Sequence, residues 1–473
     1  MKQVIVIGAG ISGLAFAHRL EELSKAQNIP IRLTILEKSS RIGGAIATES
    51  REGFLIEKGP DSFLSEKPWA LELARDLFVG PEIIGTHEQN RRVFVARSGE
   101  LLGIPQGFHL IAPKSILSFL KSPLFSWQGK ARVLMEMGLP KSKVGEDESI
   151  ASFIERRFGK EALQCVGQPM IAGVYSGDPE QLSMQNTMPR FKELEAKYGS
   201  VILGLKKTAK SKAVPEKTSG VRYSLFLSFK KGMETLTRAL ADSLPANTFY
   251  MATEIEKLYR DVVSGKWTIT ARSGQVLTAD LIGFALPAKA VSPLIHPFEP
   301  ALSEKLNQIS YESVATLYFA YPRQAISHSL NGFGFVVPAA EKKSLMACTF
   351  VDKKFPGRAP SEHALFRVFV GGAFGKRYFE MSDQELTRTA QKELSEFLGI
   401  KGQPIFSTLH RHTEALPQYK VGHASLVAAI ETKVQRFPGL YLTGASYRGT
   451  GIPDCVHDAR VQADMAFQWL HRL

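Results

Sequence analysis

The first forty residues alternate between short apolar runs and glycine-rich or polar breaks. Residues 4–7 form a β-branched apolar run, typical of a parallel strand that is buried on both faces. Apolar residues at helical spacing follow over 14–23, and a second apolar run covers 31–36. The pattern therefore predicts a strand, a helix and a second strand, which together form one β-α-β unit.

The rest of the chain changes character twice. Residues 101–209 carry apolar stripes at helical spacing, at 116–120, 131–137 and 150–158. Strand-like runs return after residue 249, at 255–258, 267–270, 281–286, 315–321, 333–337 and 365–370. We expect a helix from Asp383, a plausible N-cap, to Leu398, and a final strand at 440–445 followed by a helix over 455–470.

A glycine fingerprint joins the first strand to the first helix. It consists of Gly8, Ala9, Gly10, Ile11, Ser12 and Gly13. Gly8 permits a tight turn, Gly10 lets a pyrophosphate approach the backbone, and Gly13 lets helix and strand pack closely. Glu37 follows the second strand, where a carboxylate can bind ribose hydroxyls. This order of elements predicts a dinucleotide site; the alternative is a glycine-rich turn without a ligand.

Two further turns favour FAD over NAD. Lys38, Arg41, Gly43 and Gly44 follow Glu37 directly, and this suits a pyrophosphate that is held by two loops. Another turn then consists of Gly59, Pro60, Asp61 and Ser62. This clustering resembles the amine-oxidase-like flavoproteins, so we expect FAD as the cofactor.

The C-terminal region contains a second glycine-rich turn before a helix, over residues 449–454. Backbone N–H groups and the positive end of a helix dipole could there face the N1–C2=O edge of a flavin, which gains negative charge on reduction. The alternative is that the glycines and Pro453 only cap the helix.

Composition narrows the class of protein. The 473 residues have a net charge of +13, which favours anionic partners such as nucleic acid, acidic lipid or a polycarboxylate ligand. Three widely spaced cysteines exclude a disulfide scaffold and indicate a reducing compartment. The chain has no run of eighteen apolar residues, so we expect no membrane-spanning helix. The apolar start could imitate a secretory signal, but its glycines indicate the dinucleotide fingerprint instead.

Two segments are strongly basic. Residues 101–145 hold six basic residues and only Glu136 as an acid, interleaved with Phe108, Phe119, Phe125 and Trp127. Such a segment could lie in a membrane interface, or form a solvated face over an ordinary core. Residues 206–222 are also basic, and we interpret them as an exposed linker because no nucleic-acid recognition motif accompanies them.

Four motifs together resemble the oxygen-dependent porphyrinogen oxidases of haem synthesis, and the resemblance covers the whole chain. The first two lie at residues 8–13 and 59–63. The third covers 172–178, with Leu182 and Ser183 downstream, and the fourth covers 444–449 together with 453–455. The resemblance implies an α/β fold with three parts. These are an FAD-binding Rossmann-like domain (1–90, 210–299 and 406–473), a helical membrane-associating domain at the substrate cleft (101–209) and an α+β substrate-binding domain (300–405 with 91–100).

The resemblance also implies a reaction. Such enzymes use FAD and molecular oxygen to remove six hydrogens from a porphyrinogen, and we expect protoporphyrinogen IX to be converted to protoporphyrin IX. Coproporphyrinogen III is the alternative substrate. Remoter alternatives are a flavin amine oxidase, a carotenoid desaturase or a non-catalytic flavin- or porphyrin-binding scaffold. We expect a cytoplasmic protein, peripheral on the anionic inner face of the cell membrane, with possible contacts to neighbouring haem-pathway enzymes and none to nucleic acid. The sequence does not indicate the oligomeric state.

Site residues follow from the resemblance position by position. Gly173 matches a backbone close to the reacting meso carbon, and no acid or base is assigned. Arg92 matches a residue that binds a propionate, although beside Arg91 it could be plain surface charge. The other substrate-binding matches are Phe333, Val336, Phe369 and Lys67. Phe333 and Phe369 could instead be ordinary core residues.

The cofactor-binding positions lie in all the motifs above. They are Gly8, Ala9, Gly10, Ile11, Ser12, Gly13, Glu37, Lys38, Gly43, Gly44, Gly59, Pro60, Asp61, Ser62, Ile255 (through its backbone, to adenine), Ala445, Thr450, Gly451 and Ile452. His410 and His412 could suggest a metal site. Because no third ligand has a useful spacing, we interpret them as structural and expect no metal.

Overall fold

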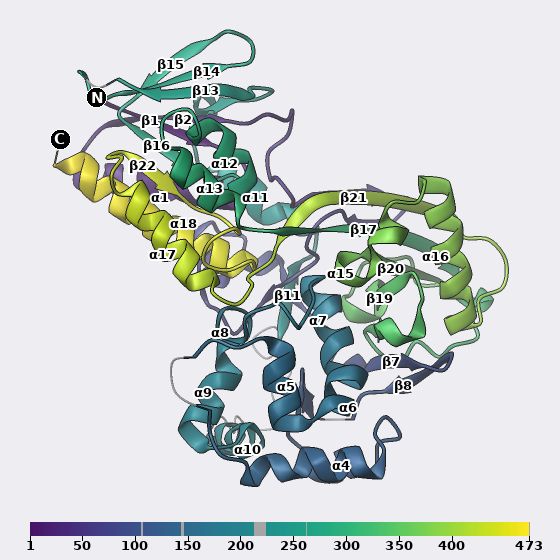
Figure 1. Cartoon of the computed structure of the whole chain (residues 1–473). Helices are drawn as coiled ribbons and strands as arrows, with labels where there is room; N and C mark the ends of the chain where they lie inside the picture. Colours follow the sequence, from purple (N-terminus) through teal and green to yellow (C-terminus); the bar gives the residue numbers. More distant parts are fainter. Residues whose placement is uncertain (106, 143–145, 212–223, 262, 473) are drawn as a thin grey trace.

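A parallel sheet of five strands, in the order β12-β2-β1-β16-β22, forms the part of the molecule that contains both termini (Figure 1). The structure is a computed structural model that describes residues 1–105, 107–142, 146–211, 224–261 and 263–472. Every pairing between the five strands is parallel. The strands are β1 (Lys2–Ile7), β2 (Ile31–Leu36), β12 (Phe249–Tyr250), β16 (Leu281–Phe284) and β22 (Leu440–Leu442).

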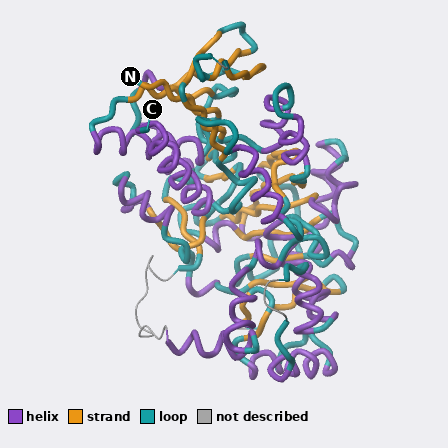
Figure 2. The backbone as a smooth tube through the Cα atoms, turned by 60° about the vertical axis from the view of Figure 1, so that its left-hand side comes forward, coloured by secondary structure: helices purple, strands orange, loops and turns teal. Residues whose placement is uncertain are grey.

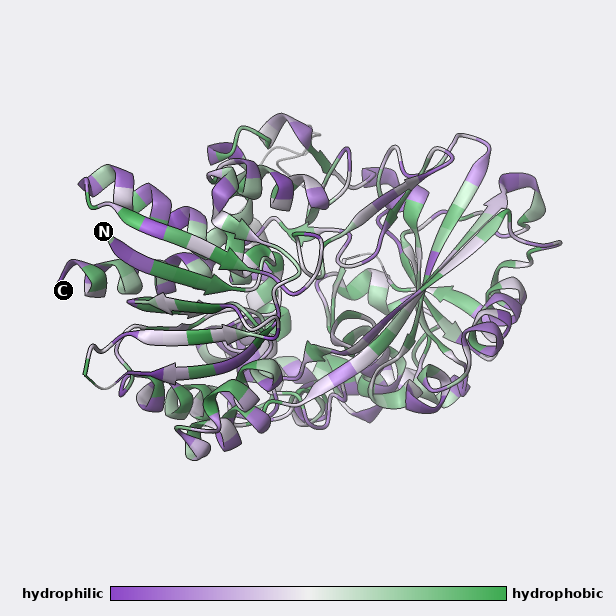
Figure 3. Ribbon diagram, turned by 90° about the horizontal axis from the view of Figure 1, so that it is seen from above, coloured by the Kyte–Doolittle hydropathy of each residue, from purple (hydrophilic) through white to green (hydrophobic). Residues whose placement is uncertain are grey.

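Strand β1 is apolar throughout its centre because both faces of this sheet are covered. Val4 and Val6 pack into a core with one group of helices, whereas Ile5 and Ile7 point to the opposite core. Figure 3 shows the strands as largely hydrophobic and the helices as alternating in hydropathy. The first core contains α1 (Ile11–Gln27), α2 (Trp69–Asp76), α11 (Glu234–Asp242) and α18 (Ile452–His471). The second contains β13 (Ile255–Arg260), β14 (Trp267–Ala271), β15 (Val276–Ala279), α12 (Ala288–Ile295), α13 (Pro300–Asn307) and α17 (His423–Val434).

A second, seven-stranded sheet has the order β21-β17-β20-β19-β18-β7-β8. Helix α16 (Asp383–Leu398) covers one face, where Leu386, Ala390 and Leu394 pack into the core of that side. The strands are β7 (Val93–Arg97), β8 (Glu100–Gly103), β17 (Tyr311–Pro322), β18 (Gly334–Val336), β19 (Leu345–Phe350), β20 (His363–Gly371) and β21 (Phe406–Pro417). The short helices α14 (Val351–Lys354) and α15 (Gly372–Phe379) complete this part.

Helices between residues 116 and 211 form the third part, at the bottom of Figures 1 and 2. Their hydrophobic core includes Phe153, Ile154 and Phe191 and also Val336 and Ala347 of the seven-stranded sheet, so the helices pack directly on that sheet. The helices are α3 (Ile116–Leu120), α4 (Trp127–Leu134), α5 (Ile150–Phe158), α6 (Lys160–Ala162), α7 (Gln168–Tyr175), α8 (Met184–Thr187), α9 (Pro189–Tyr198) and α10 (Val201–Ser211). A π-helical segment, Leu163–Gly167, leads into α7.

Short strands connect these parts. They are the hairpin β3 (Thr48–Arg51) and β4 (Phe54–Glu57), the sheet of β5 (Phe63–Leu64), β6 (Ile83–Gly85) and β11 (Phe226–Phe229), and the pair β9 (Phe108–His109) and β10 (Ala112–Pro113). Within the described ranges, none of the helices combines the length and apolar character needed to cross a membrane.

The α/β class is confirmed, and the helices expected at 116–120 and 150–158 have those bounds. The expected N-cap of α16 was wrong. Ser382, not Asp383, caps the helix, because its hydroxyl accepts the Glu385 N–H while the Glu385 carboxylate accepts the Ser382 N–H.

Two interpretations of the basic segments need correction. Phe119 and Phe125 are buried in the helical core, so they cannot line a membrane-facing surface, whereas Trp127 is 75% exposed. Lys206, Lys207 and Lys210 belong to helix α10 and not to a loop. The remainder of the expected basic linker, residues 212–222, lies outside the described residues.

The expected domain limits stay a prediction, but strand pairing and packing change two of them. Strand β21 pairs with β17 along its length, so residues 406–417 belong to the substrate-side sheet and not to the FAD-binding part. Helix α13 packs with α12 in the core behind the parallel sheet, so residues 300–307 belong with the FAD-binding part. Periodicity could not locate these limits, because it does not indicate which strand a given strand pairs with.

Candidate functional site

The loop between β1 and α1 holds glycines that the surrounding backbone requires. Gly8 has a φ of +105°, and a Cβ there would lie 2.7 Å from the carbonyl oxygen of Ala285. A Cβ on Gly13 would lie 1.9 Å from the Gly8 carbonyl oxygen, so this contact of helix and strand excludes every side chain. At Gly10 the nearest atom to a Cβ would be Gly44 Cα at 3.8 Å. The backbone of Gly10 therefore leaves room for a ligand.

The start of α1 suits an anion. Its first turn contains no acidic residue, and no side chain of the described residues caps it. Its first N–H groups and its dipole can therefore act on a phosphate. The loop of Gly43 and Gly44 lies against it: the Gly43 N–H donates to the Ala9 carbonyl at 2.8 Å. Arg41 donates to the carbonyls of Ile42, Gly44 and Ile46, so it holds this second loop in place.

Glu37 is buried at the end of β2, beside the first glycine loop. Its carboxylate accepts the Ala9 N–H at 2.8 Å and the Ser39 N–H at 2.9 Å. Each oxygen keeps a further lone pair that could accept a ribose hydroxyl. Lys38 is exposed next to it. The Thr253 N–H donates to the Glu37 carbonyl at 2.8 Å, which brings the start of β13 at Ile255 to the same end of the sheet.

The turn over residues 59–62 joins the two sheets. A Cβ on Gly59 would lie 1.8 Å from the Ala45 carbonyl oxygen. Arg367 of β20 donates to the Gly59 carbonyl at 2.6 Å, and Lys354 forms an ion pair with Asp61 at 2.8 Å. Burial opposes the charge of Asp61, but Lys354 and Arg367 hold the pKa of its carboxyl well below its ordinary value. Asp61 is therefore a permanent anion that fixes the turn.

A second carboxyl near this turn behaves in the opposite way. Glu57 is 2% exposed and accepts hydrogen bonds from the Thr48 hydroxyl at 2.7 Å and the Met233 N–H at 2.8 Å. These bonds do not offset its desolvation, and burial raises the pKa of Glu57 to about 7. The folded protein therefore binds a proton at Glu57 more tightly than the unfolded chain does.

This difference predicts a pH dependence of stability. The ordinary pKa is 4.5, so the stabilisation from protonated Glu57 is fully present below pH 4.5 and is lost as the pH rises through 7. For wild type, we expect this group to lower the free energy of unfolding by about 2 to 3 kcal/mol between pH 5 and pH 8. Urea unfolding at both pH values should show that Glu57→Gln removes this loss. The control Glu256→Gln, at an exposed site, should keep the wild-type loss of stability. A pH dependence in Glu57→Gln that equals that of wild type would contradict the raised pKa of Glu57.

The C-terminal loop meets the N-terminal one. Beyond β22, a Cβ on Gly444 would lie 3.7 Å from the hydroxyl of Ser12. Helix α18 then begins at Ile452 after Gly451, and no described side chain caps its first turn by a hydrogen bond. Thr450 is exposed at this turn, and Ala445 is half-buried. The starts of two helices and the Glu37 carboxylate therefore surround one place, which fits FAD.

Lys67 forms an ion pair at the start of α18. Its ammonium lies 2.6 and 2.7 Å from the two carboxylate oxygens of Asp454, in the first turn of that helix. The substrate-binding role expected for Lys67 stays a prediction. The sequence could not show this pairing, because the two residues are 387 positions apart.

Val336 and Phe369, two of the residues expected to contact the substrate, share one face of the seven-stranded sheet. Strand register places Val336, Ala347, Phe369, Thr316 and His410 in one row across five strands. Gly173 of α7 lies against the apolar end of this row: a Cβ there would be 3.2 Å from Val336 Cγ1 and 3.6 Å from Ala347 Cβ. The structure therefore brings Gly173, Val336 and Phe369 together.

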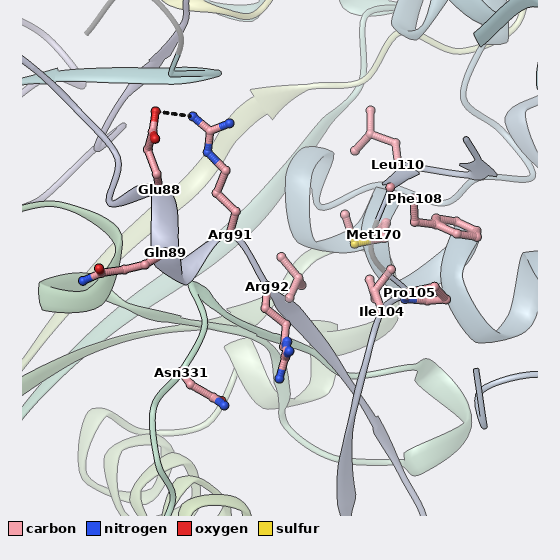
Figure 4. Close-up of a pocket in the computed structure, with 12 residues that line it drawn as sticks. Glu88, Gln89, Arg91, Arg92, Ile104, Pro105, Phe108, Leu110, Met170 and Asn331 are labelled. Atoms are coloured by element: carbon pink, nitrogen blue, oxygen red, sulfur yellow. Dashed lines mark ion pairs between the residues drawn. The ribbon is translucent and has the colours of Figure 1, made fainter. Parts of the chain in front are cut away.

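Arg92 lines a pocket of about 440 Å³ beside that row (Figure 4). Figure 4 shows Arg91, Arg92, Gln89 and Asn331 on one side and the apolar side chains on the other. Those on the apolar side are Ile104, Pro105, Phe108, Leu110 and Met170. Met170 lies about one helical turn before Gly173 on α7, so the same helix contacts the pocket and the row. Phe333 joins Arg92 through its N–H, which donates to the Arg92 carbonyl at 2.7 Å, and it is half-buried.

His410 and His412 lie on β21, on the same sheet face as Arg367 and Thr316. Burial, with the positive charges of Lys58 and Arg367, lowers the pKa of His410; burial and Arg367 do the same for His412. Among the described residues, no three His, Cys, Asp or Glu side chains are placed to hold a metal ion.

Sequence reasoning missed two buried residues that connect the motifs. Arg367 is 5% exposed, stacks 4.7 Å from the centroid of Phe369 and donates to Gly59, so it contacts both the substrate row and the cofactor-side turn. Tyr419 contacts the C-terminal loop through its hydroxyl. An arginine inside an apolar strand run, at residues 365–370, was a visible signal for the first. Tyr419 lies in no motif and gave no signal.

Comparisons with known proteins agree with this geometry. The sequence pattern of the flavin containing amine oxidoreductase family matches residues 11–465. A coproporphyrinogen III oxidase from Bacillus subtilis (strain 168) is 34% identical over 471 residues, covering 99% of this chain and 98% of that protein. The mitochondrial protoporphyrinogen oxidase of Nicotiana tabacum is 27% identical and covers 99% of this chain and 95% of its own length.

Solved structures give the same result. A crystal structure provisionally named a protoporphyrinogen oxidase, from Exiguobacterium sp. 255-15, superposes with a TM-score of 0.86 at 28% identity and covers 99% of both chains. A putrescine oxidase with a TM-score of 0.69 and 14% identity, covering 100% of this chain and 99% of its own, shares the fold. FAD is therefore the cofactor of this fold and of this site. The chain belongs to the flavin containing amine oxidoreductase family and, within it, to the porphyrinogen oxidases.

Proposed function

We propose that the protein uses FAD and molecular oxygen to oxidise a porphyrinogen to the porphyrin, a six-electron reaction, with coproporphyrinogen III as its substrate. The observation that carries the proposal is the pocket at Arg92, where a guanidinium faces apolar side chains and so suits a macrocycle that carries carboxylates. The names of the relatives support the same chemistry.

The chain contributes orientation in this mechanism. Bound FAD supplies the two-electron acceptor, which oxygen re-oxidises with release of hydrogen peroxide. The apolar side chains of the Arg92 pocket present a surface to the macrocycle and exclude water, while the absence of a side chain at Gly173 keeps α7 packed against Val336 and Ala347. The guanidinium of Arg92 binds a propionate at the pocket, which fixes the rotation of the ring. Three rounds of two-electron oxidation require the ring to turn or rebind between rounds.

Coproporphyrinogen III is favoured over protoporphyrinogen IX for two reasons. Its four propionates, against two, suit a pocket that contains Arg92, Gln89 and Asn331 as well as Arg91, which pairs with Glu88 at 3.7 Å. Two relatives that are 34% and 30% identical are both named coproporphyrinogen III oxidase. Protoporphyrinogen IX, expected first from the sequence, becomes the second candidate.

The test compares both porphyrinogens with the purified holoenzyme. Anaerobic mixing should bleach the flavin, and air should then give porphyrin fluorescence faster than a boiled control, with coproporphyrinogen III the better substrate. A rate equal to the boiled control would overturn the proposal. Peroxide release with polyamines alone would favour an amine oxidase. Oxidation of a carotene would favour a desaturase, and flavin binding without turnover would favour a non-catalytic scaffold.

Arg92 offers a prediction on specificity. Arg92→Ala should raise the KM for coproporphyrinogen III about tenfold, because a charge-assisted hydrogen bond at an exposed site contributes about 1.4 kcal/mol. FAD content should not change. Steady-state kinetics with both porphyrinogens checks this, with Arg272→Ala, an exposed arginine paired with Glu254, as the control. An unchanged KM would show that the pocket does not bind a propionate.

Attachment to the inner face of the cell membrane stays a prediction, as do the cytoplasmic location and contacts with neighbouring haem-pathway enzymes. Leu117, Trp127 and Met135 are exposed on and just after helices α3 and α4, near the exposed Lys114 and Lys121, and this mixture supports an anionic interface. Co-sedimentation with anionic but not zwitterionic vesicles would support attachment. Equal recovery in the supernatant with both would contradict it.

A further inference from the structure

Residues 418–423 connect β21 to α17 and contact both sides of the site. The side-chain amide of Gln418 donates to the Tyr175 carbonyl at 3.2 Å, at the end of the helix that carries Gly173. The next residue, Tyr419, contacts the C-terminal loop instead. Its hydroxyl donates to the Ala445 carbonyl at 2.7 Å and accepts the Gly449 N–H at 2.7 Å. Two neighbours in sequence therefore contact the substrate helix and the cofactor loop.

His423 extends the contact with the loop. Its ring stacks on Tyr419, with centroids 3.9 Å apart and planes at 14°, and its Nε2 lies 3.0 Å from the Tyr447 carbonyl oxygen. Because a carbonyl only accepts, Nε2 must donate. Tyr419 and His423 together therefore hold residues 445, 447 and 449, every second residue of the loop.

The same segment is bound to the helical part by its backbone. The Ser183 N–H donates to the Tyr419 carbonyl at 2.8 Å, and the Val421 N–H donates to the Gln181 carbonyl at 3.0 Å. The Gly422 N–H donates to Asp147 at 3.1 Å. Gln418, Tyr419 and His423 are buried, so their side-chain bonds are shielded from water, whereas Val421 and Gly422 are exposed. The segment therefore keeps its position relative to the helical part.

We propose that residues 418–423, which we call the 418–423 bridge, set the position of the C-terminal cofactor loop relative to Gly173, with Tyr419 as the positioning residue. This inference rests on the proposed function. Ser446 and Arg448 fix the loop by side-chain contacts to Tyr311 and Asp458, whereas Tyr419 and His423 hold its backbone at residues 445, 447 and 449. A displacement of about 1 Å between reacting groups lowers a rate about 100-fold, which makes such a bridge effective.

Tyr419→Phe tests the proposal, because it keeps the stacked ring and removes both hydroxyl bonds. Relative to wild-type holoenzyme, we expect about tenfold weaker FAD binding, equivalent to about 1.4 kcal/mol. We also expect about tenfold slower flavin reduction by coproporphyrinogen III at saturating FAD, with KM unchanged. Tyr441→Phe is the matched control, because its hydroxyl bonds only to the Met465 carbonyl, at 3.3 Å, among the described contacts. A Tyr419→Phe protein that is less thermostable, but has normal FAD affinity and reduction rate, would overturn the proposal.

Gln418→Met tests the other end of the bridge. It removes the bonds to the carbonyls of Tyr175 and of Leu416 in β21, and it should leave FAD affinity unchanged while slowing flavin reduction about tenfold. If Tyr419→Phe fails to fold, this variant decides alone, and a normal reduction rate overturns the proposal. If wild type itself is not reduced by a porphyrinogen, the proposed function fails. In that case, fluorescence titration without substrate still tests the positioning of the loop. A lower FAD affinity in Tyr419→Phe than in wild type supports it, and an unchanged FAD affinity overturns it.

Discussion

Gly13→Ala should abolish FAD binding and with it all oxidase activity. The new Cβ would lie 1.9 Å from the Gly8 carbonyl oxygen and 3.1 Å from Ala285 Cβ. Neither neighbour can give way, because the Ala285 N–H donates to Ile7 within the parallel sheet and Gly8 continues β1. The start of α1 must therefore move away from the strand, and the N–H groups of its first turn move with it.

The expected size of this effect is at least 100-fold in the dissociation constant of FAD, equivalent to about 2.7 kcal/mol. Overpacking of this kind also lowers the free energy of unfolding by about 1 to 3 kcal/mol. Fluorescence titration of the apoprotein with FAD measures the dissociation constant, and urea unfolding measures the free energy of unfolding. Gly138→Ala is the matched control, since a Cβ there would meet no described atom within 4 Å. Normal FAD affinity in Gly13→Ala would mean that the cofactor does not depend on this helix start.

Gly173→Val should lower kcat/KM for a porphyrinogen at least 100-fold while FAD content stays normal. A Cβ at this position points at Val336 Cγ1 and Ala347 Cβ, at 3.2 and 3.6 Å, so a methyl group alone is tight and valine would push α7 away from the sheet. Met170 of the same helix lines the Arg92 pocket, so this displacement would change the place where we expect the macrocycle to bind. Because the reaction depends on close approach, a displacement of about 1 Å is sufficient for a loss of this size.

Stopped-flow measurement of anaerobic flavin reduction isolates the step that Gly173→Val should block. Gly173→Ala should give a smaller loss, and Val174→Ala on the same helix, where the side chain is exposed, should give none. Full activity in Gly173→Val would show that the packing of α7 on Val336 and Ala347 does not position the substrate. The proposed function would then need another substrate surface.

Local sequence predicted the cofactor-binding half of the molecule well. The apolar runs, the glycines and Glu37 lie within forty residues of one another, and each constrains the chain through its immediate neighbours. Burial on both faces made β1 and β16 continuous apolar runs, which are unmistakable. The substrate side was less predictable. Phe333, Val336 and Phe369 came only from a resemblance, because core and ligand-facing aromatics have the same pattern.

Long-range pairing determines what sequence spacing could not indicate. Lys67 pairs with Asp454, and residues 406–417 pair with β17; both depend on segments that meet only in the folded chain. Phe119 and Phe125 are interleaved with lysines in sequence, yet the packing of α3 turns them inward. A basic, aromatic segment therefore looks the same whether its rings are buried or exposed.

The sequence by itself determined that a β-α-β unit would form at the N-terminus and bind a dinucleotide, because the turn, the helix start and the acid act over short distances. Only the tertiary structure decided where the C-terminal loop lies. Gly444 reaches Ser12, and Tyr419 and Gln418 connect the loop to the helix of Gly173, through hydrogen bonds between residues far apart in the chain. Such bonds depend on distances in space, and spacing along a sequence does not encode those distances.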